Sequence, residues 1–271
     1  MKKQKILEVY SLALMDGVSE KISNYMVEPP GIFRGRGTHP LIGKLKGRII
    51  PENVSINVGT NNPVPVCSIS GHCWDKIVHN NEATWLAYYK DINNKKSKKY
   101  VFLSASSKLK GQNDLKKYEK ARKLKDEIEK IRKDYTKKLS DNSEEKRQLG
   151  VATYLIDKLA LRVGNEKGED EADTVGCCSL RVEHLQIEED NKITFDFLGK
   201  DSMRYFNTVE LDEKIHENIK RFIKGKDKRD DLFDLINASK LNDYLKSLMD
   251  GLSAKVFRTY NASITLQKGM I

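Results

Sequence analysis

Three basic side chains stand in sequence contexts that suit the binding of an anion. Arg162 ends the apolar segment Leu159–Leu161, and Arg258 follows the apolar residue Phe257. An arginine is costly to bury unless an anion accompanies it. Lys200 stands in a polar turn between two strand-like runs. Taken one at a time, these contexts favour internal salt bridges for the arginines and a solvated turn for the lysine, and an anion site is the alternative.

The anion that pairs with an arginine could come from the chain itself. Acidic residues follow Arg162 closely, namely Glu166, Asp170, Glu171 and Asp173. The spacing alone leaves open whether the guanidinium meets one of these carboxylates or an external ligand.

A second group of arginines lies in the loop Phe33–Gly37, whose sequence is FRGRG. The glycines would let the backbone come close to a partner, and Arg34 and Arg36 would then face something anionic. Two solvated arginines on a tight turn are the alternative. The loop lacks the strand–turn–helix context of a dinucleotide site.

Several common sites are absent from the sequence. It contains no G-x-x-x-x-G-K-[ST] loop, no H-E-x-x-H motif and no His/Cys set with zinc spacing, so we expect neither ATP, a metal nor another cofactor. The four cysteines, at 67, 73, 177 and 178, are expected to be reduced thiols. No apolar run is long enough to cross a bilayer, so no membrane is expected as a partner.

Positive charge is concentrated in one part of the chain. Residues 86–138 hold 18 Lys and Arg against 7 Asp and Glu. The excess of 11 positive charges in this segment is larger than the net charge of +10 of the whole chain. Such a stretch attracts a polyanion, of which nucleic acid is the obvious candidate. A solvated helix face is the alternative.

The expected elements divide the chain into a strand-rich and a helix-rich part. Residues 1–107 contain three short β-rich runs, Val54–Val58, Thr84–Tyr89 and Tyr100–Leu103. The polar tract 93–99 predicts a hairpin loop. An apolar stripe predicts a long helix over 113–139, with the members Leu115, Tyr118, Ala121, Leu124, Ile128, Ile131, Tyr135 and Leu139.

The rest of the chain predicts further helices and one hairpin. A helix should begin near Ser143 and end at Gly164. Runs 193–198 and 203–209 predict a hairpin around Gly199–Ser202. Helices are expected over 212–224, 239–250 and 254–267, with Gly251 as a cap for the middle one.

At the residues named above, the sequence resembles the eukaryotic type IB DNA topoisomerases. The resemblance covers nearly the whole chain, and its long runs occur in the family's order: Glu28–Pro40 (EPPGIFRGRGTHP), Ile156–Lys167 (IDKLALRVGNEK), Ala172–His184 (ADTVGCCSLRVEH), Phe195–Ser202 (FDFLGKDS) and Ala254–Gln267 (AKVFRTYNASITLQ).

The resemblance implies an activity and three catalytic residues. Members relax supercoils without ATP, by a tyrosine that attacks a DNA phosphate and forms a 3′-phosphotyrosine. Arg162 and Arg258 match the arginines that hold the phosphate oxygens, and Lys200 matches the lysine that protonates the leaving 5′-oxygen.

The resemblance also implies contacts to DNA. Arg36 matches an arginine near the cut, and Asp201 stands beside the matched lysine. We expect further contacts to DNA from Arg34, Lys46, Lys108 and Lys255. The expected partner is duplex DNA, and the expected location is the nucleus.

The fold implied is of the α+β class. A β-rich cap lobe, partial at its N-terminal side, is expected over 1–107. A mainly helical catalytic lobe with a small antiparallel sheet is expected over 108–271, incomplete at its C-terminus and similar to tyrosine recombinases and type IB topoisomerases.

The resemblance also implies a histidine downstream of the 254–267 run and a tyrosine in a separate C-terminal domain. This chain departs from the family at both residues. None of the five histidines follows Gln267, and none of the eleven tyrosines lies in a family-like nucleophile motif. We therefore expect this chain alone to be inactive. A truncated product is favoured, and the alternatives are one subunit of a split enzyme, with a separate C-terminal chain supplying both residues, or a paralogue that only binds DNA. A site-specific tyrosine recombinase is disfavoured by the Glu28–Pro40 run.

Overall fold

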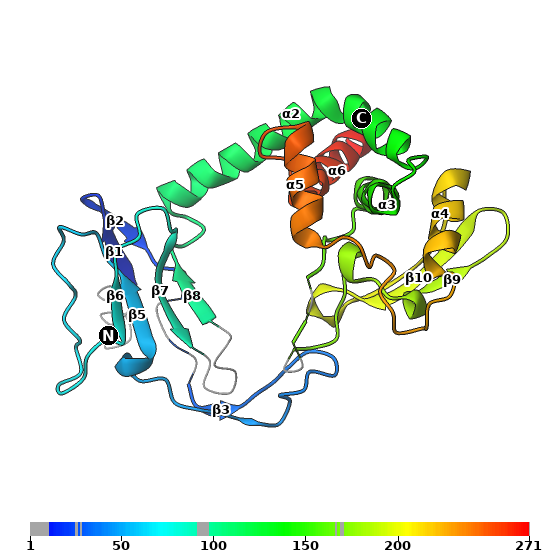
Figure 1. Cartoon of the computed structure of the whole chain (residues 1–271). Coiled ribbons are helices and arrows are strands. Elements are labelled where there is room, and N and C mark those ends of the chain that lie inside the picture. The colour runs from blue at the N-terminus through cyan, green and yellow to red at the C-terminus, as the bar shows by residue number, and fades with distance from the viewer. Residues whose placement is uncertain are drawn as a thin grey trace. The chain divides into compact units, whose positions relative to one another are not determined.

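The computed structural model describes residues 11–24, 27, 29–90, 98–165, 167–168 and 171–270. Its contacts divide the chain into two compact units. The first unit comprises Met1–Gly35 and Leu41–Leu115, and the second comprises Arg36–Pro40 and Lys116–Ile271. Figure 1 colours the chain from the N-terminus to the C-terminus and labels the elements used below. The boundary predicted from the sequence is 107/108. The two compact units meet inside a helix, between residues 115 and 116, and the short segment 36–40 belongs to the second unit.

The first unit is built on a four-stranded sheet in the order β6-β5-β7-β8, and β5 pairs in parallel with β6 and antiparallel with β7. A backbone bridge from Ile22 to Leu103 continues the sheet beyond β8. Two short antiparallel pairs, β1 with β2 and β3 with β4, complete its strands. The bounds are Leu12–Met15 for β1, Val18–Lys21 for β2, Gly31–Ile32 for β3, Leu45–Lys46 for β4, Val54–Asn57 for β5, Lys76–Val78 for β6, Trp85–Lys90 for β7 and Lys98–Phe102 for β8.

The strands predicted in this unit are confirmed. The three β-rich runs correspond to β5, β7 and β8. Most of the predicted loop at 93–99 lies outside the described residues, and its last two residues begin β8. β-Branched and aromatic residues dominate these runs and suit a pleated surface.

The long predicted helix is present as α2, Lys108–Lys138. Its buried side chains run from Ala121 to Tyr135 at helical spacing. The predicted stripe is wrong at its start, because Leu115 is 62% exposed and Tyr118 is 48% exposed. Periodicity identifies one face of a helix but does not say where along the helix a core covers that face.

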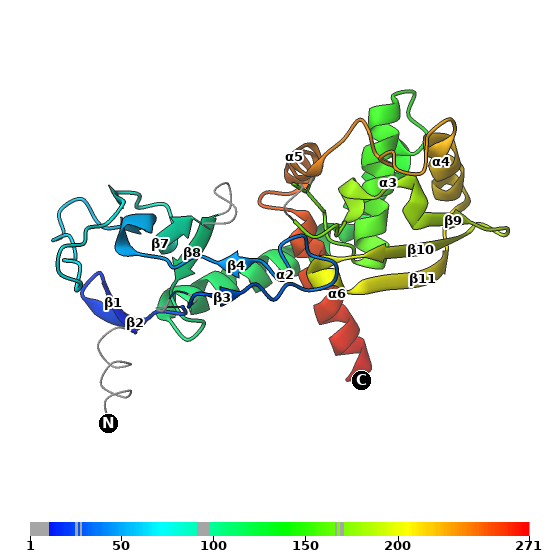
Figure 2. The same cartoon turned by 90° about the horizontal axis from the view of Figure 1, so that it is seen from below.

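The second unit surrounds α3 with helices and a small sheet. α3 packs against α4, α5 and α6, and nearly every side chain from Gln148 to Asp157 is buried. The sheet has the order β11-β10-β9 and is antiparallel throughout; its three strands lie side by side in Figure 2. The bounds are Glu144–Leu159 for α3, Leu185–Ile187 for β9, Lys192–Leu198 for β10, Arg204–Glu210 for β11, Glu213–Ile223 for α4, Ala238–Leu248 for α5 and Ala254–Gly269 for α6.

The predicted hairpin and helices of this unit are confirmed, and two predicted helix ends are wrong. α3 begins directly after Ser143 as predicted, but it ends at Leu159, where Ala160 takes the left-handed conformation with φ 52°. Gly164 therefore does not end this helix. Gly251 does not cap α5 either, because α5 ends at Leu248 and Met249 is extended. Gly251, with φ +68°, lies in the turn that leads to α6.

The fold is thus a mixture of helices and small, mostly antiparallel sheets. Within the described ranges, no helix is both long enough and apolar enough to cross a membrane.

Gly150 tests the packing of α3 against the end of α2. A Cβ at Gly150 would lie 2.9 Å from the main-chain oxygen of Tyr135 and 3.1 Å from Leu139 Cδ2. Gly150→Ala should therefore lower the free energy of unfolding by about 1–3 kcal/mol, although alanine favours helices. The measurement is urea denaturation followed by circular dichroism.

Gly111 supplies the matched control for this experiment. It lies in α2, and a Cβ there would meet nothing within 4 Å. Gly111→Ala should leave stability unchanged or raise it by up to about 1 kcal/mol. A Gly150→Ala protein as stable as the parent would contradict the close helix contact.

Candidate functional site

Arg162 is positioned by the end of α3 and by a segment that returns alongside it. Leu161 is buried, and Arg162 itself is exposed. The main-chain oxygens of residues 162 and 163 accept hydrogen bonds of 2.7 Å from the amides of Cys177 and Cys178. The buried neighbour and the backbone bonds fix the Arg162 main chain, while its guanidinium stays accessible.

Two glycines allow this close backbone approach. A Cβ at Gly176 would lie 2.5 Å from the amide nitrogen of Gly164 and 2.7 Å from the main-chain oxygen of Arg162. A Cβ at Gly164 would likewise lie 2.7 Å from the Cα of Gly176, and Gly164 has φ +78°. Both positions need a residue without a Cβ, and Gly164 also has the positive φ that glycine adopts most easily.

The same returning segment reaches the β10–β11 hairpin. The Val175 amide donates to the main-chain oxygen of Leu198 at 2.8 Å, two residues before Lys200. The Gly199 amide closes the turn on the Met203 oxygen at 2.8 Å. Lys200 is exposed at this tip, as the sequence predicted. One short segment thus connects the backbone of Arg162 to the hairpin that carries Lys200.

Arg258 approaches the same end of α3 from α6. Its neighbours Val256 and Phe257 are buried, and its Nη1 donates to the main-chain oxygen of Ala160. The pKa of the Arg258 guanidinium is lowered because the group is partly buried and because the charge of Arg162 lies close. The structure therefore brings the two predicted arginines together.

Within the described part of the chain, no acidic side chain lies at salt-bridge distance from Arg162, Lys200 or Arg258. Of the three, Arg162 and Arg258 are the two that the structure brings together, and like charges held together without a counter-ion favour binding of an anion.

The acidic residues proposed as internal partners are engaged elsewhere or are not described. Asp173 pairs with Arg181 at 2.8 Å, which holds the pKa of that carboxyl below its usual value. Glu171 accepts from the Gly168 amide at 3.2 Å. Glu166 and Asp170 lie outside the described residues. Neither Asp173 nor Glu171, the two described carboxylates, therefore forms the internal salt bridge with Arg162 that the sequence left open.

Arg36 and Asp201 form an ion pair that the sequence analysis missed. Arg36 Nη1 lies 3.0 Å from Asp201 Oδ1, and the two side chains are 71% and 50% exposed. Gly37 lies against the same hairpin tip, where a Cβ would be 2.5 Å from Ser202 Oγ. An exposed pair of this kind contributes about 0–1 kcal/mol. Nothing in residue spacing signals a contact between positions so far apart in sequence.

The remaining predicted residues are distributed over both units. Arg34, Lys46 and Lys108 belong to the first unit. Arg34 is exposed, Lys46 ends β4, and the Lys108 amide contacts the Glu20 carboxylate at the start of α2. Lys255 is exposed in the first turn of α6, in the second unit.

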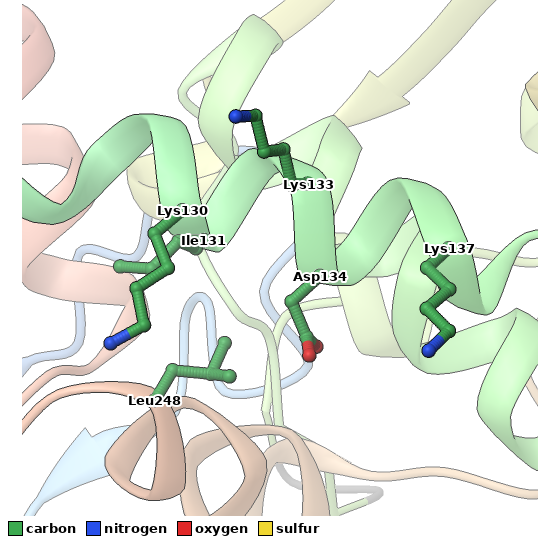
Figure 3. A pocket seen from close by; sticks show the side chains of 6 residues that line it. All are labelled: Lys130, Ile131, Lys133, Asp134, Lys137 and Leu248. Carbon is green, nitrogen blue, oxygen red and sulfur yellow. The ribbon is translucent and has the colours of Figure 1, made fainter.

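A surface pocket of the second unit contains none of these residues. It measures about 250 Å³ between α2 and α5. Figure 3 shows Leu248 and Asp134 on one side of α2, while the ammonium of Lys133 points away from them. Asp134 accepts from the Tyr244 hydroxyl at 2.6 Å. The pocket is lined by Lys130, Ile131, Lys133, Asp134, Lys137 and Leu248. Its small volume and its helix-to-helix bond indicate a packing gap rather than a ligand site. Over the described residues, no cluster of three or more His, Cys, Asp or Glu could hold a metal ion.

Gly176 tests whether the glycine contact sets the position of Arg162. Gly176→Ala would push on main-chain atoms of residues 162 and 164, which cannot rotate away as a side chain could. The free energy of unfolding should fall by about 1–3 kcal/mol. The measurement is urea denaturation of the chain.

Gly168→Ala is the control, because Gly168 lies between Gly164 and Gly176 in the sequence and a Cβ there would meet nothing within 4 Å. Equal stability of the two variants would show that the contact between Gly164 and Gly176 does not constrain the site.

Comparison with known proteins identifies the family. Residues 106–270 match the family described as eukaryotic DNA topoisomerase I, catalytic core, and residues 1–103 match its DNA binding fragment. The chain is 58% identical over 264 residues to DNA topoisomerase 1 beta of Arabidopsis thaliana, which covers 97% of this chain and 29% of that protein.

Two further relatives agree. DNA topoisomerase 1 of Schizosaccharomyces pombe is 56% identical over 259 residues, which are 95% of this chain and 31% of that protein. DNA topoisomerase 1 of Homo sapiens is 49% identical over 271 residues, which are 98% of this chain and 35% of that protein. The chain thus spans about a third of the length of the relatives it matches. Because the core match alone covers more than half of its residues, the chain belongs to the eukaryotic DNA topoisomerase I family.

Proposed function

We propose that this chain forms the DNA-binding and catalytic core of a type IB DNA topoisomerase, which relaxes supercoiled duplex DNA without ATP. One observation carries the proposal: the Arg258 guanidinium donates to the main-chain oxygen of Ala160, two residues before Arg162, and no described carboxylate forms an ion pair with either arginine. A phosphodiester supplies the missing negative charge, and its two non-bridging oxygens suit two guanidinium groups.

The proposed chemistry assigns one role to each basic side chain. A tyrosine, which the resemblance places C-terminal to these residues, gives its hydroxyl proton to solvent, attacks the phosphorus and forms a 3′-phosphotyrosine. The bond from phosphorus to the 5′-oxygen breaks, and Lys200 gives that oxygen a proton. Arg162 and Arg258 stabilise the charge that develops on the non-bridging oxygens. Rejoining reverses these steps and returns the proton to Lys200.

Further residues would hold the duplex. We assign contacts to DNA to Arg34, Arg36, Lys46, Lys108, Asp201 and Lys255, of which Arg36 and Asp201 also hold one another. The helix α2 adds a row of exposed lysines along its outer surface. Contacts of this kind neutralise phosphates and release counterions, so binding should weaken as salt rises.

The proposal includes the lobes and the location inferred from the resemblance. Residues 1–107 would act as a β-rich cap lobe, and residues 108–271 would act as a catalytic lobe like that of tyrosine recombinases. The strands within residues 12–102 and the mainly helical content of residues 108–269 support this division. Chromosomal DNA as the substrate implies a nuclear location.

A relaxation assay tests the proposal. The chain is joined to the C-terminal segment of the Schizosaccharomyces pombe relative, and the fused protein is mixed with supercoiled plasmid in the absence of ATP. Relaxation is expected. Arg162→Ala and Arg258→Ala should each slow relaxation about 100- to 1,000-fold, since a preorganised charge contact is worth about 3–4 kcal/mol in the transition state.

Lys158→Ala is the matched control, because Lys158 is exposed on α3 near the same end of the helix. It should relax plasmid at the rate of the parent. A fused protein that binds duplex DNA but never relaxes it would leave only a DNA-binding function. A fused protein that binds no duplex even at low salt would overturn that function as well.

A further inference from the structure

A buried carboxylate joins α2 to α3 close to the catalytic arginines. The side chain of Asp157 is 0% exposed and accepts hydrogen bonds from Arg132 Nε at 2.9 Å and from the Tyr135 hydroxyl at 2.9 Å. Arg132 Nη2 adds a third donor at 3.3 Å. A buried carboxylate is stable only with such partners. Asp157 is therefore a fixed point, five residues before Arg162.

The main chain of the same residue is held by α6. The side-chain amide of Asn261 donates to the main-chain oxygen of Asp157 at 2.6 Å. This oxygen is among the last carbonyls of α3, which have no partner inside the helix. Arg258, one turn earlier on α6, donates to the main-chain oxygen of Ala160. Two consecutive turns of α6 thus bind the end of α3 at two points.

We propose that Asn261 is a positioning residue, which sets the separation of Arg162 and Arg258 by tying α6 to the fixed point at Asp157. This inference rests on the proposed function. Nη1 of Arg258 donates to the main-chain oxygen of Ala160. The direction of the remaining N–H donors of Arg258 therefore depends on how α6 packs against α3. Without the Asn261 bond, only the Arg258 side chain itself would join the two helices by a described hydrogen bond.

The test uses variants that separate size from hydrogen bonding. Asn261→Asp keeps the shape but removes the donor, and it places a charge beside a carbonyl oxygen. Asn261→Gln keeps the donor on a longer side chain. Thr259→Ala is the control, because the Thr259 hydroxyl donates only within α6, to the Lys255 oxygen at 3.3 Å.

Cleavage is measured in a single turnover on a short duplex, at saturating DNA, with the fused protein described above. Asn261→Asp should cleave about 10- to 100-fold more slowly, because a displacement of about 1 Å can cost about 100-fold in rate. Its dissociation constant for the duplex should stay within about twofold of the parent. Asn261→Gln should recover most of the rate, and Thr259→Ala should match the parent.

The chain of 271 residues by itself supplies a second readout. Hydrogen exchange of the amides over 158–163 should be faster in Asn261→Asp than in Thr259→Ala, since the end of α3 loses its tie.

The outcomes separate this inference from the proposed function. If the unsubstituted fused protein does not relax plasmid, the proposed function fails, and the positioning role fails with it. If it relaxes plasmid and Asn261→Asp cleaves at the same rate, only the positioning role is overturned. A parallel loss of rate and of DNA affinity in Asn261→Asp would also overturn it, because that pattern indicates general damage to the fold.

Discussion

The second unit holds the positive charges of Arg162 and Arg258 close together. Neither arginine forms an ion pair with a described carboxylate, and the local backbone must accommodate this constraint. The partial burial of Arg258 and the nearby charge of Arg162 both disfavour the charged guanidinium and lower its pKa. Such a pair persists only when the surrounding backbone fixes both residues. The end of α3, the returning segment 175–178 and the first turns of α6 supply that fixation through main-chain carbonyls. An anion bound between the two arginines would relieve this repulsion.

Most contacts that hold Arg162 and Arg258 in place involve backbone atoms. The type of contact determines which substitutions each neighbouring position can accept. Gly164 and Gly176 admit no side chain because main-chain atoms face them. Asp157 is held by donors from α2 that would lose their partner if the carboxylate were removed. By contrast, the ion pair of Arg36 with Asp201 is open to solvent, so it orients the loop 36–40 without adding much stability.

Sequence reasoning recovered the elements better than the contacts between them. Periodicity located α2, the β10–β11 hairpin and the helices that follow, because apolar spacing reports local structure directly. It misjudged Leu115 and Tyr118, since a pattern does not reveal where the covering core begins. Spacing alone also left the partner of Arg162 open between a carboxylate and a ligand. The ties from Asn261 to Asp157 and from Arg36 to Asp201 had no sequence signal, because a bond from a side chain to a distant residue leaves no periodic pattern.

We infer that Arg162 and Arg258 bind one phosphate together. The most direct measurement is nuclear magnetic resonance of the arginine Nε–H groups in the chain, assigned by single substitutions, during titration with a short duplex. We expect the signals of Arg162 and Arg258 to shift together with a natural duplex, and neither to shift with a duplex whose phosphates are replaced by neutral methylphosphonates. Binding of the natural duplex while both signals stay unchanged would contradict it.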